Sequence, residues 1–162
     1  MKNEKINGAI FSPSQLSGEE GWTFFDAGSL IDGSLRFVSG DTSGNRYRIN
    51  YYKDNVGHLC ARIWLGPGTE GPRGYSHGGA VAAVLDEVLS LAACAKGFSV
   101  VMGKISIRFC HMVPLECVMT VESRVLSIKG RRIAVNGRML LGKKVFAEAE
   151  GLCISILSRS VF

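Results

Sequence analysis

The sequence predicts a single α+β domain in which an antiparallel sheet wraps around one long helix. Three observations support this: two alternating strand-like runs come first, one long run of small and apolar residues follows, and four further strand-like runs end the chain. The 162 residues suffice for one domain with a real core, and 46% hydrophobic and 20% charged residues are ordinary globular values. One sheet that covers one buried helix accounts for this order of elements.

Turn residues set the expected boundaries of these elements. Residues 54–57 form a turn between the first two strands, Ser76 is the expected N-cap of the helix, and Gly97 is its expected stop. Residues 1–44 give weak signals, so we interpret them as a poorly defined N-terminal extension of a domain that spans 45–162. The expected strands cover residues 45–53, 58–66, 100–111, 115–128, 131–141 and 145–157, and the helix lies between the second and the third.

Composition and charge argue against several classes of protein. The net charge of +5 is modest and the basic residues are scattered, so we do not expect nucleic-acid binding. The five cysteines form no C-x-x-C pair, which favours reduced thiols in a cytoplasmic protein, and no paired metal-ligand spacing occurs. Two acids inside the apolar run 78–95 argue against a membrane span, and the first ten residues lack the apolar core of a secretory signal.

Those two acids are Asp86 and Glu87, in the middle of the predicted helix. A carboxylate on a covered face of small residues is costly unless it is paired or its pKa rises, and a general base or nucleophile needs either condition. The alternative is a structural ion pair with an arginine such as Arg108, and of the two acids Glu87 is assigned the structural role. Asp86 shares its face with Gly79, Ala82, Ala83, Ser90 and Ala93, whereas Val81, Val84, Leu85, Val88 and Leu91 form the side expected on the sheet.

The predicted start of the helix is a second candidate site. Gly78 and Gly79 lie in its first turn, where backbone N–H groups have no partner within the helix and no side chain shields them. Such a terminus stabilises an anion or a polarised carbonyl oxygen. The preceding His77 is either part of this site or a packed ring. Ser90, one turn beyond Asp86, either bonds to that carboxylate or bonds back to its own helix.

Two stretches carry a family resemblance. GPRGYSHGGAVAAVLDE (71–87) and ISIRFCHMVPLECVMTVESRVLSIKGRR (105–132) resemble acyl-CoA thioesterases with the hot-dog fold, of the phenylacetyl-CoA-thioesterase and thioesterase-superfamily-member branches. The similarity spans roughly residues 45–156. It implies hydrolysis of an acyl-CoA thioester to a free acid and CoA, with no cofactor besides the CoA of the substrate. It also implies that Asp86 is the base or nucleophile and that Gly78 or Gly79, with His77 beside them, binds the oxyanion.

Two positions depart from the family pattern. Gly71 stands where some members have an asparagine, and Met102 stands where several have a threonine or serine that orients water. Water positioning is therefore unassigned, with Ser90 or Ser99 as substitutes. A non-catalytic hot-dog module that binds acyl-CoA, as a sensor or assembly partner, is the alternative function. The lack of a hydroxyl at Met102 favours this alternative, whereas the presence of Asp86 argues against it.

Further expectations concern the rest of the ligand and the assembly. The residues expected at the CoA phosphates are Arg73, Lys104, Arg108, Arg131 and Arg132, although a basic hairpin is often only a solvated turn. Phe109, Met112 and Met119 indicate an apolar tunnel for the acyl group.

Gly78 and Asp86 lie eight positions apart, about 12 Å along a helix, although both must reach one carbonyl. We therefore expect a homodimer in which two antiparallel helices share each site, and the resemblance implies that such dimers often pair again into tetramers.

Overall fold

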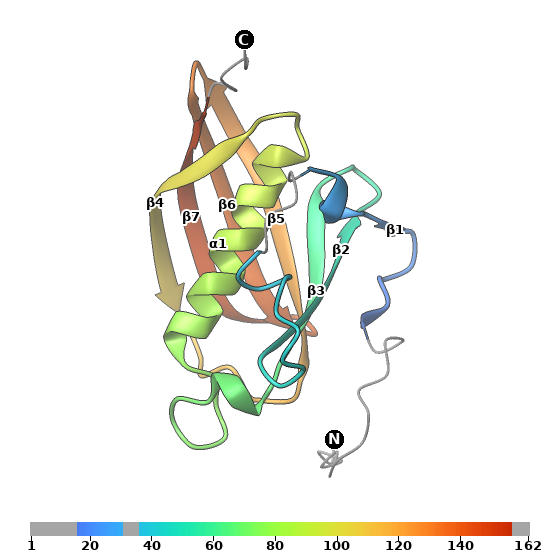
Figure 1. Ribbon diagram of the computed structural model, residues 1–162, viewed down its shortest axis with the longest axis vertical. Helices are drawn as coiled ribbons and strands as arrows, with labels where there is room; N and C mark the ends of the chain where they lie inside the picture. The colour runs from blue at the N-terminus through green and yellow to red at the C-terminus, as the bar shows by residue number, and fades with distance from the viewer. Residues whose placement is uncertain (1–15, 31–35, 157–162) are drawn as a thin grey trace.

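The computed structural model describes residues 16–30 and 36–156, which form one antiparallel sheet in the order β1-β2-β3-β5-β6-β7-β4 with a single long helix, α1, against one face (Figure 1). We call the face that packs on α1 the inner face and the opposite face the outer face. The predicted fold class is confirmed, and the main elements lie within a few residues of their expected bounds. They are β1 (Thr23–Phe24), β2 (Tyr47–Lys53), β3 (Leu59–Leu65), α1 (Gly78–Cys94), β4 (Val100–Phe109), β5 (Val118–Lys129), β6 (Arg132–Leu141) and β7 (Lys144–Ser155), with short 3₁₀ turns at Ala27–Leu30 and Pro67–Thr69.

Burial of one side of α1 forms the core. The apolar side chains that the sequence places toward the sheet are fully buried, and they pack against inner-face residues such as Ile63, Met119 and Ile133. The other side of the helix, with Asp86 and Glu87, is only half-buried. Among the described residues, no helix combines the length and the apolar composition that a membrane crossing requires.

The helix begins differently from the prediction. His77, not Ser76, is the N-cap: its backbone is extended and its Nδ1 accepts a hydrogen bond from the Gly79 N–H at 2.9 Å. Ser76 is buried, donating its N–H to the Val113 carbonyl at 2.8 Å and its hydroxyl to Thr69 Oγ1 at 3.2 Å. The Ser76 prediction was wrong because tertiary contacts of the preceding loop use its polar groups.

The helix also ends earlier than predicted. Its last residue is Cys94, and Gly97 takes a positive φ of 92° in the turn that leads into β4. That backbone conformation favours glycine, so Gly97 serves the turn and does not end the helix directly.

The described part of the N-terminal extension wraps around one edge of the sheet. Leu16 packs on Trp64 at the outer face, and its carbonyl accepts a hydrogen bond from the Tyr52 hydroxyl at 2.6 Å. The chain then pairs with β2 through β1 and reaches the inner face, where Ala27 and Val38 join the main core. We call residues 36–44, which run beside α1 before β2 begins, the strap.

The opposite edge of the sheet is open. β4 pairs only with β7, so one side of this ten-residue strand has no partner among the described residues. Apolar side chains lie along it, with Val101 50% and Phe109 52% exposed. An unpaired strand edge of this length is a template for pairing with another strand.

Candidate active site

The open side of α1 carries Asp86. This carboxylate is half-buried and forms no hydrogen bond or ion pair with any of residues 16–30 and 36–156. Burial, and then the neighbouring charge of Glu87, raise the pKa of Asp86. A desolvated carboxyl group without a partner has the properties that a general base or nucleophile requires.

Ser90 and Cys153 adjoin Asp86. Burial above all, then the nearby Cys94 and Asp86, raise the pKa of the Cys153 thiol to about 11, and a hydrogen bond with Ser90 offsets part of that rise. Cys153 is therefore a neutral thiol at ordinary pH. Nothing in the sequence indicated this contact, because β7 lies more than fifty residues after the helix. Ser90 thus has a partner that neither sequence-based alternative included.

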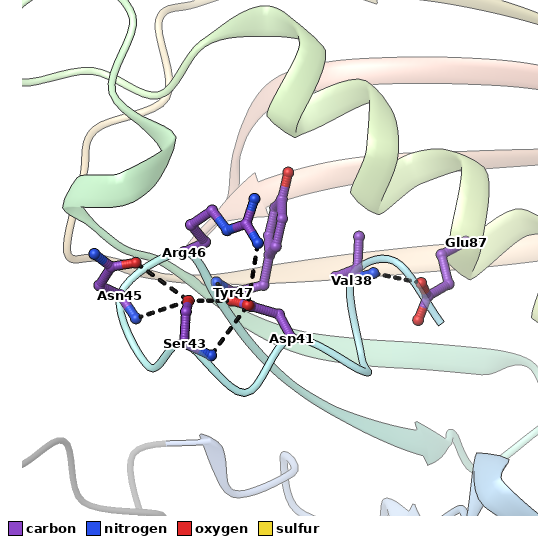
Figure 2. Close-up of polar contacts among 7 residues, drawn as sticks. All are labelled: Val38, Asp41, Ser43, Asn45, Arg46, Tyr47 and Glu87. Atoms are coloured by element: carbon purple, nitrogen blue, oxygen red, sulfur yellow. Dashed lines mark hydrogen bonds and ion pairs between the residues drawn. The ribbon is translucent and has the colours of Figure 1, made fainter. Parts of the chain in front are cut away.

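Glu87 has an environment unlike that of its neighbour. Its carboxylate accepts a hydrogen bond from the backbone N–H of Val38 at 2.9 Å (Figure 2). It also accepts hydrogen bonds from the Tyr51 hydroxyl at 2.7 Å and from the backbone N–H of Ser39 at 3.0 Å. Glu87 therefore has structural contacts, as predicted, but with the strap and β2 and not with an arginine. The predicted partner Arg108 pairs instead with Glu148 of β7 on the outer face, so the ion-pair alternative was wrong.

The two glycines at the start of α1 differ in their backbone donors. The N–H of Gly79 is occupied by His77 Nδ1, whereas the N–H of Gly78 has no acceptor among the described residues. A cavity of about 320 Å³ lies against Gly78. A Cβ atom at Gly78 would be 3.6 Å from the Phe109 ring, so the bare backbone faces this cavity across a narrow gap. Its lining residues include Pro72, Ser76, Phe109, His111, Met112 and Val113.

The residues predicted to form an apolar tunnel separate into two groups. Phe109 and Met112 line the cavity and are more than half exposed, at 52% and 58%. Met119 is fully buried in the core under α1 and does not line it. His111 also lines the cavity, where its ring packs edge-on against Phe146 with centroids 5.7 Å apart.

The predicted basic residues are not brought together within one chain. Arg73 follows Pro72 at the cavity, whereas Lys104 and Arg108 lie on the outer face of β4. Arg131 and Arg132 lie at the β5–β6 turn, where Arg131 Nε donates to the Ser155 carbonyl at 2.9 Å.

That turn is far from the cavity. Ser155 pairs with Val100, at the opposite end of β4 from Phe109. One chain therefore places only Arg73 near Gly78.

Of the two serines expected to replace the missing hydroxyl, only Ser90 lies beside Asp86. Met102 is half-buried against the core on the inner face of β4 and supplies no hydroxyl. A Cβ atom at Gly71 would lie 2.8 Å from the His77 Cα, so an asparagine would not fit at that position without a backbone shift. Ser99 is exposed in the turn before β4. Water positioning stays unassigned within the chain.

Comparison with known proteins identifies the family. Residues 73–145, which include the helix start, Asp86 and the open strand β4, match the family model of the thioesterase superfamily. The chain is 33% identical over 123 residues to acyl-coenzyme A thioesterase THEM4 of Bos taurus, with 74% of this chain aligned to 51% of that protein. The matched region, residues 73–145, belongs to the thioesterase superfamily. The Xenopus laevis protein of the same name is 30% identical over 98 residues, with 60% of this chain aligned to 44% of that protein.

Solved structures of the thioesterase superfamily support the same assignment. The crystal structure of one superfamily protein is 27% identical, with a TM-score of 0.62, and the match covers 66% of this chain and 53% of that one. The hot-dog arrangement of sheet and helix is thus shared with this superfamily. The chain spans about half the length of the two THEM4 relatives that it matches.

Proposed function

We propose that this chain hydrolyses acyl-CoA thioesters to a free acid and CoA, in active sites shared between two copies. One combination of observations carries the proposal. Gly78 lines a cavity at the start of α1 and its N–H has no acceptor among the described residues, and the same helix carries on its open side the carboxylate of Asp86, which has no partner in the same part of the chain. The names of the THEM4 relatives support acyl-CoA as the substrate class.

The proposed chemistry divides the work between these two groups. The thioester carbonyl oxygen accepts the Gly78 N–H, which stabilises the negative charge that develops in the tetrahedral intermediate. As a general base, Asp86 takes a proton from water while the oxygen of that water attacks the carbonyl carbon, and collapse expels the CoA thiolate. As a nucleophile, Asp86 attacks the carbonyl carbon first and expels the CoA thiolate to form an acyl-enzyme anhydride, which water then opens. Both routes give the same acid and CoA.

The open edge of the sheet supports sharing between two subunits. Gly78 and Asp86 are separated by about 12 Å along α1 at 1.5 Å per residue, so a single helix cannot bring both to one carbonyl. Antiparallel pairing of two β4 strands continues the sheet across the dimer and places the two helices side by side in opposite directions. One subunit's Gly78 then approaches its partner's Asp86 across the open sides.

The same pairing supports a role for the distant basic residues. An antiparallel arrangement brings the β5–β6 turn of one subunit, with Arg131 and Arg132, toward the Gly78 end of the other. These arginines and Arg73 would then contact the phosphates of CoA from two chains. Lys104 and Arg108 stay on the outer face in this arrangement, and Arg108 is already paired with Glu148. We expect little contribution from those two.

A panel of aliphatic and aryl CoA thioesters, with detection of the released thiol, tests the proposal. Turnover of at least one CoA ester is expected, with a KM that rises with ionic strength because exposed phosphate contacts are screened over about 8–10 Å. An acyl-pantetheine thioester, which lacks the nucleotide, should show little salt dependence. Tight binding of acyl-CoA by calorimetry without thiol release would favour the non-catalytic binding module instead, the alternative that Met102 supports. Absence of both binding and turnover would exclude either function.

A further inference from the structure

The two acids in the middle of α1 point to different surroundings, although they are adjacent in sequence. Successive residues of a helix differ by about 100° in direction. Glu87 faces β2 and the strap, where it accepts three hydrogen bonds. Asp86 faces Ser90 and Cys153, and has no partner among the described residues. Glu87 is therefore a fixed charge and Asp86 an unrestrained one.

The strap that holds Glu87 is itself anchored. Asp41, whose side chain is only 3% exposed, accepts the Tyr47 N–H at 3.1 Å and the Ser43 hydroxyl at 2.9 Å, and pairs with Arg46 at 3.5 Å (Figure 2). Burial alone would raise the pKa of Asp41, but these contacts lower it, so Asp41 stays ionised and the strap stays docked at neutral pH. The two N–H donors of the strap are thereby presented to Glu87 from a fixed backbone.

We propose that Glu87 is a positioning residue for Asp86. The strap and Tyr51 hold its carboxylate on one flank of α1, and this fixed negative charge turns the Asp86 carboxylate toward the open flank and makes it a stronger base. The inference rests on the proposed function only for its catalytic consequence. Like charges on adjacent residues repel, and the repulsion is appreciable where both groups are partly shielded from water.

Other titratable groups near the pair do not replace Glu87 in this role. On β7, the Cys153 thiol faces Asp86 but is neutral, because its pKa is about 11. On β2, burial and then the Glu87 charge raise the pKa of Tyr51, so it remains a neutral donor. Arg36, a cation of the strap, forms no ion pair with Glu87. The raised pKa of Asp86 has Glu87 as its second cause, after burial.

Titration of the Asp86 carboxyl by ¹³C NMR tests the proposal without substrate, so the result does not depend on whether the chain is a thioesterase. Glu87→Gln should lower the pKa of Asp86. Tyr51→Phe is the matched control, since it removes one hydrogen bond to Glu87 but keeps its charge, and should leave the pKa of Asp86 near the wild-type value. An unchanged pKa in Glu87→Gln, or an equal change in both variants, would overturn the proposal.

A second variant covers the case in which Glu87→Gln does not fold. Glu87→Met removes the same charge and keeps an unbranched side chain of similar length beside the strap. The pKa of Asp86 should fall in this variant too, and an unchanged value would contradict a charge effect of Glu87.

The acid limb of kcat/KM adds a kinetic readout where turnover is measurable. In Glu87→Gln this limb should move to lower pH, because Asp86 loses its proton more readily without the neighbouring charge. On that limb, kcat/KM of the variant relative to its own plateau should therefore exceed the wild-type ratio.

Discussion

The two flanks of α1 differ in the surroundings that they give to two adjacent acids. On one flank the strap and β2 cover the helix and satisfy Glu87 with three hydrogen bonds. On the other flank Asp86 lies half-buried without a partner among the described residues, next to a strand whose edge is unpaired.

This difference separates stability from chemistry on one helix. A buried carboxylate that accepts several hydrogen bonds contributes to folding, because removal of the acceptor would leave buried donors unsatisfied. A carboxylate without partners opposes folding, and such groups persist where function requires them. The covered flank fixes the helix on the domain, and under the proposed function a second subunit and the substrate meet on the open flank.

The largest expected effect is on the open flank. Asp86→Asn should lower kcat by at least about 10²-fold, the usual contribution of a positioned acid–base group. Since the folded-state pKa of Asp86 is raised, its ionisation costs folding free energy as pH rises through that value, so the variant should be at least as stable as wild type at neutral pH. Steady-state kinetics and chemical denaturation measure the two quantities. Wild-type kcat in the pure variant would refute the assignment of Asp86.

A smaller effect tests whether the open flank is completed by a partner. Asp86→Ala and Gly78→Pro should each be inactive alone. Proline is well tolerated at the first helical position, where it removes the N–H and adds a ring beside Phe109, and the extended backbone of His77 suits a residue before proline.

Refolding the two variants together should restore about a quarter of wild-type activity, because half the dimers are mixed and each has one complete site. Native mass spectrometry confirms mixed dimers. Their presence without activity would place donor and acid in one chain.

The smallest effect concerns the covered flank. Tyr51→Phe removes a hydrogen bond to a carboxylate and should lower the free energy of unfolding by about 1.5–3 kcal/mol. Tyr52→Phe, one position along β2 and on the outer face, removes a bond to a neutral carbonyl and should cost about 0.5–1.5 kcal/mol. Urea denaturation compares them, and kcat should change little in either. A larger cost at Tyr52 would contradict the importance of the Glu87 contact.

Much of the fold could be predicted from the sequence because its signals are local. Alternating apolar residues predicted β2 to β7 within a few residues, and 3.6-residue periodicity predicted which side of α1 is buried. The candidate site could be predicted for the same reason, because His77, Gly78 and Asp86 lie in or next to one helix, whose geometry fixes the distances between its residues. The family motif then added the roles of these residues.

Only the tertiary structure decided which partner each of these groups has. His77, and not Ser76, is the N-cap. The Gly79 N–H bonds to His77, whereas the Gly78 N–H has no acceptor among the described residues. Arg108 pairs with Glu148. The tertiary structure also brought the strap to Glu87 across 48 and 49 positions of sequence. Periodicity reports which face of an element is apolar, but a hydrogen bond between distant segments depends on how the whole chain packs. For that reason the sequence determined where the two acids lie, and the packing of the strap and β2 determined how they differ.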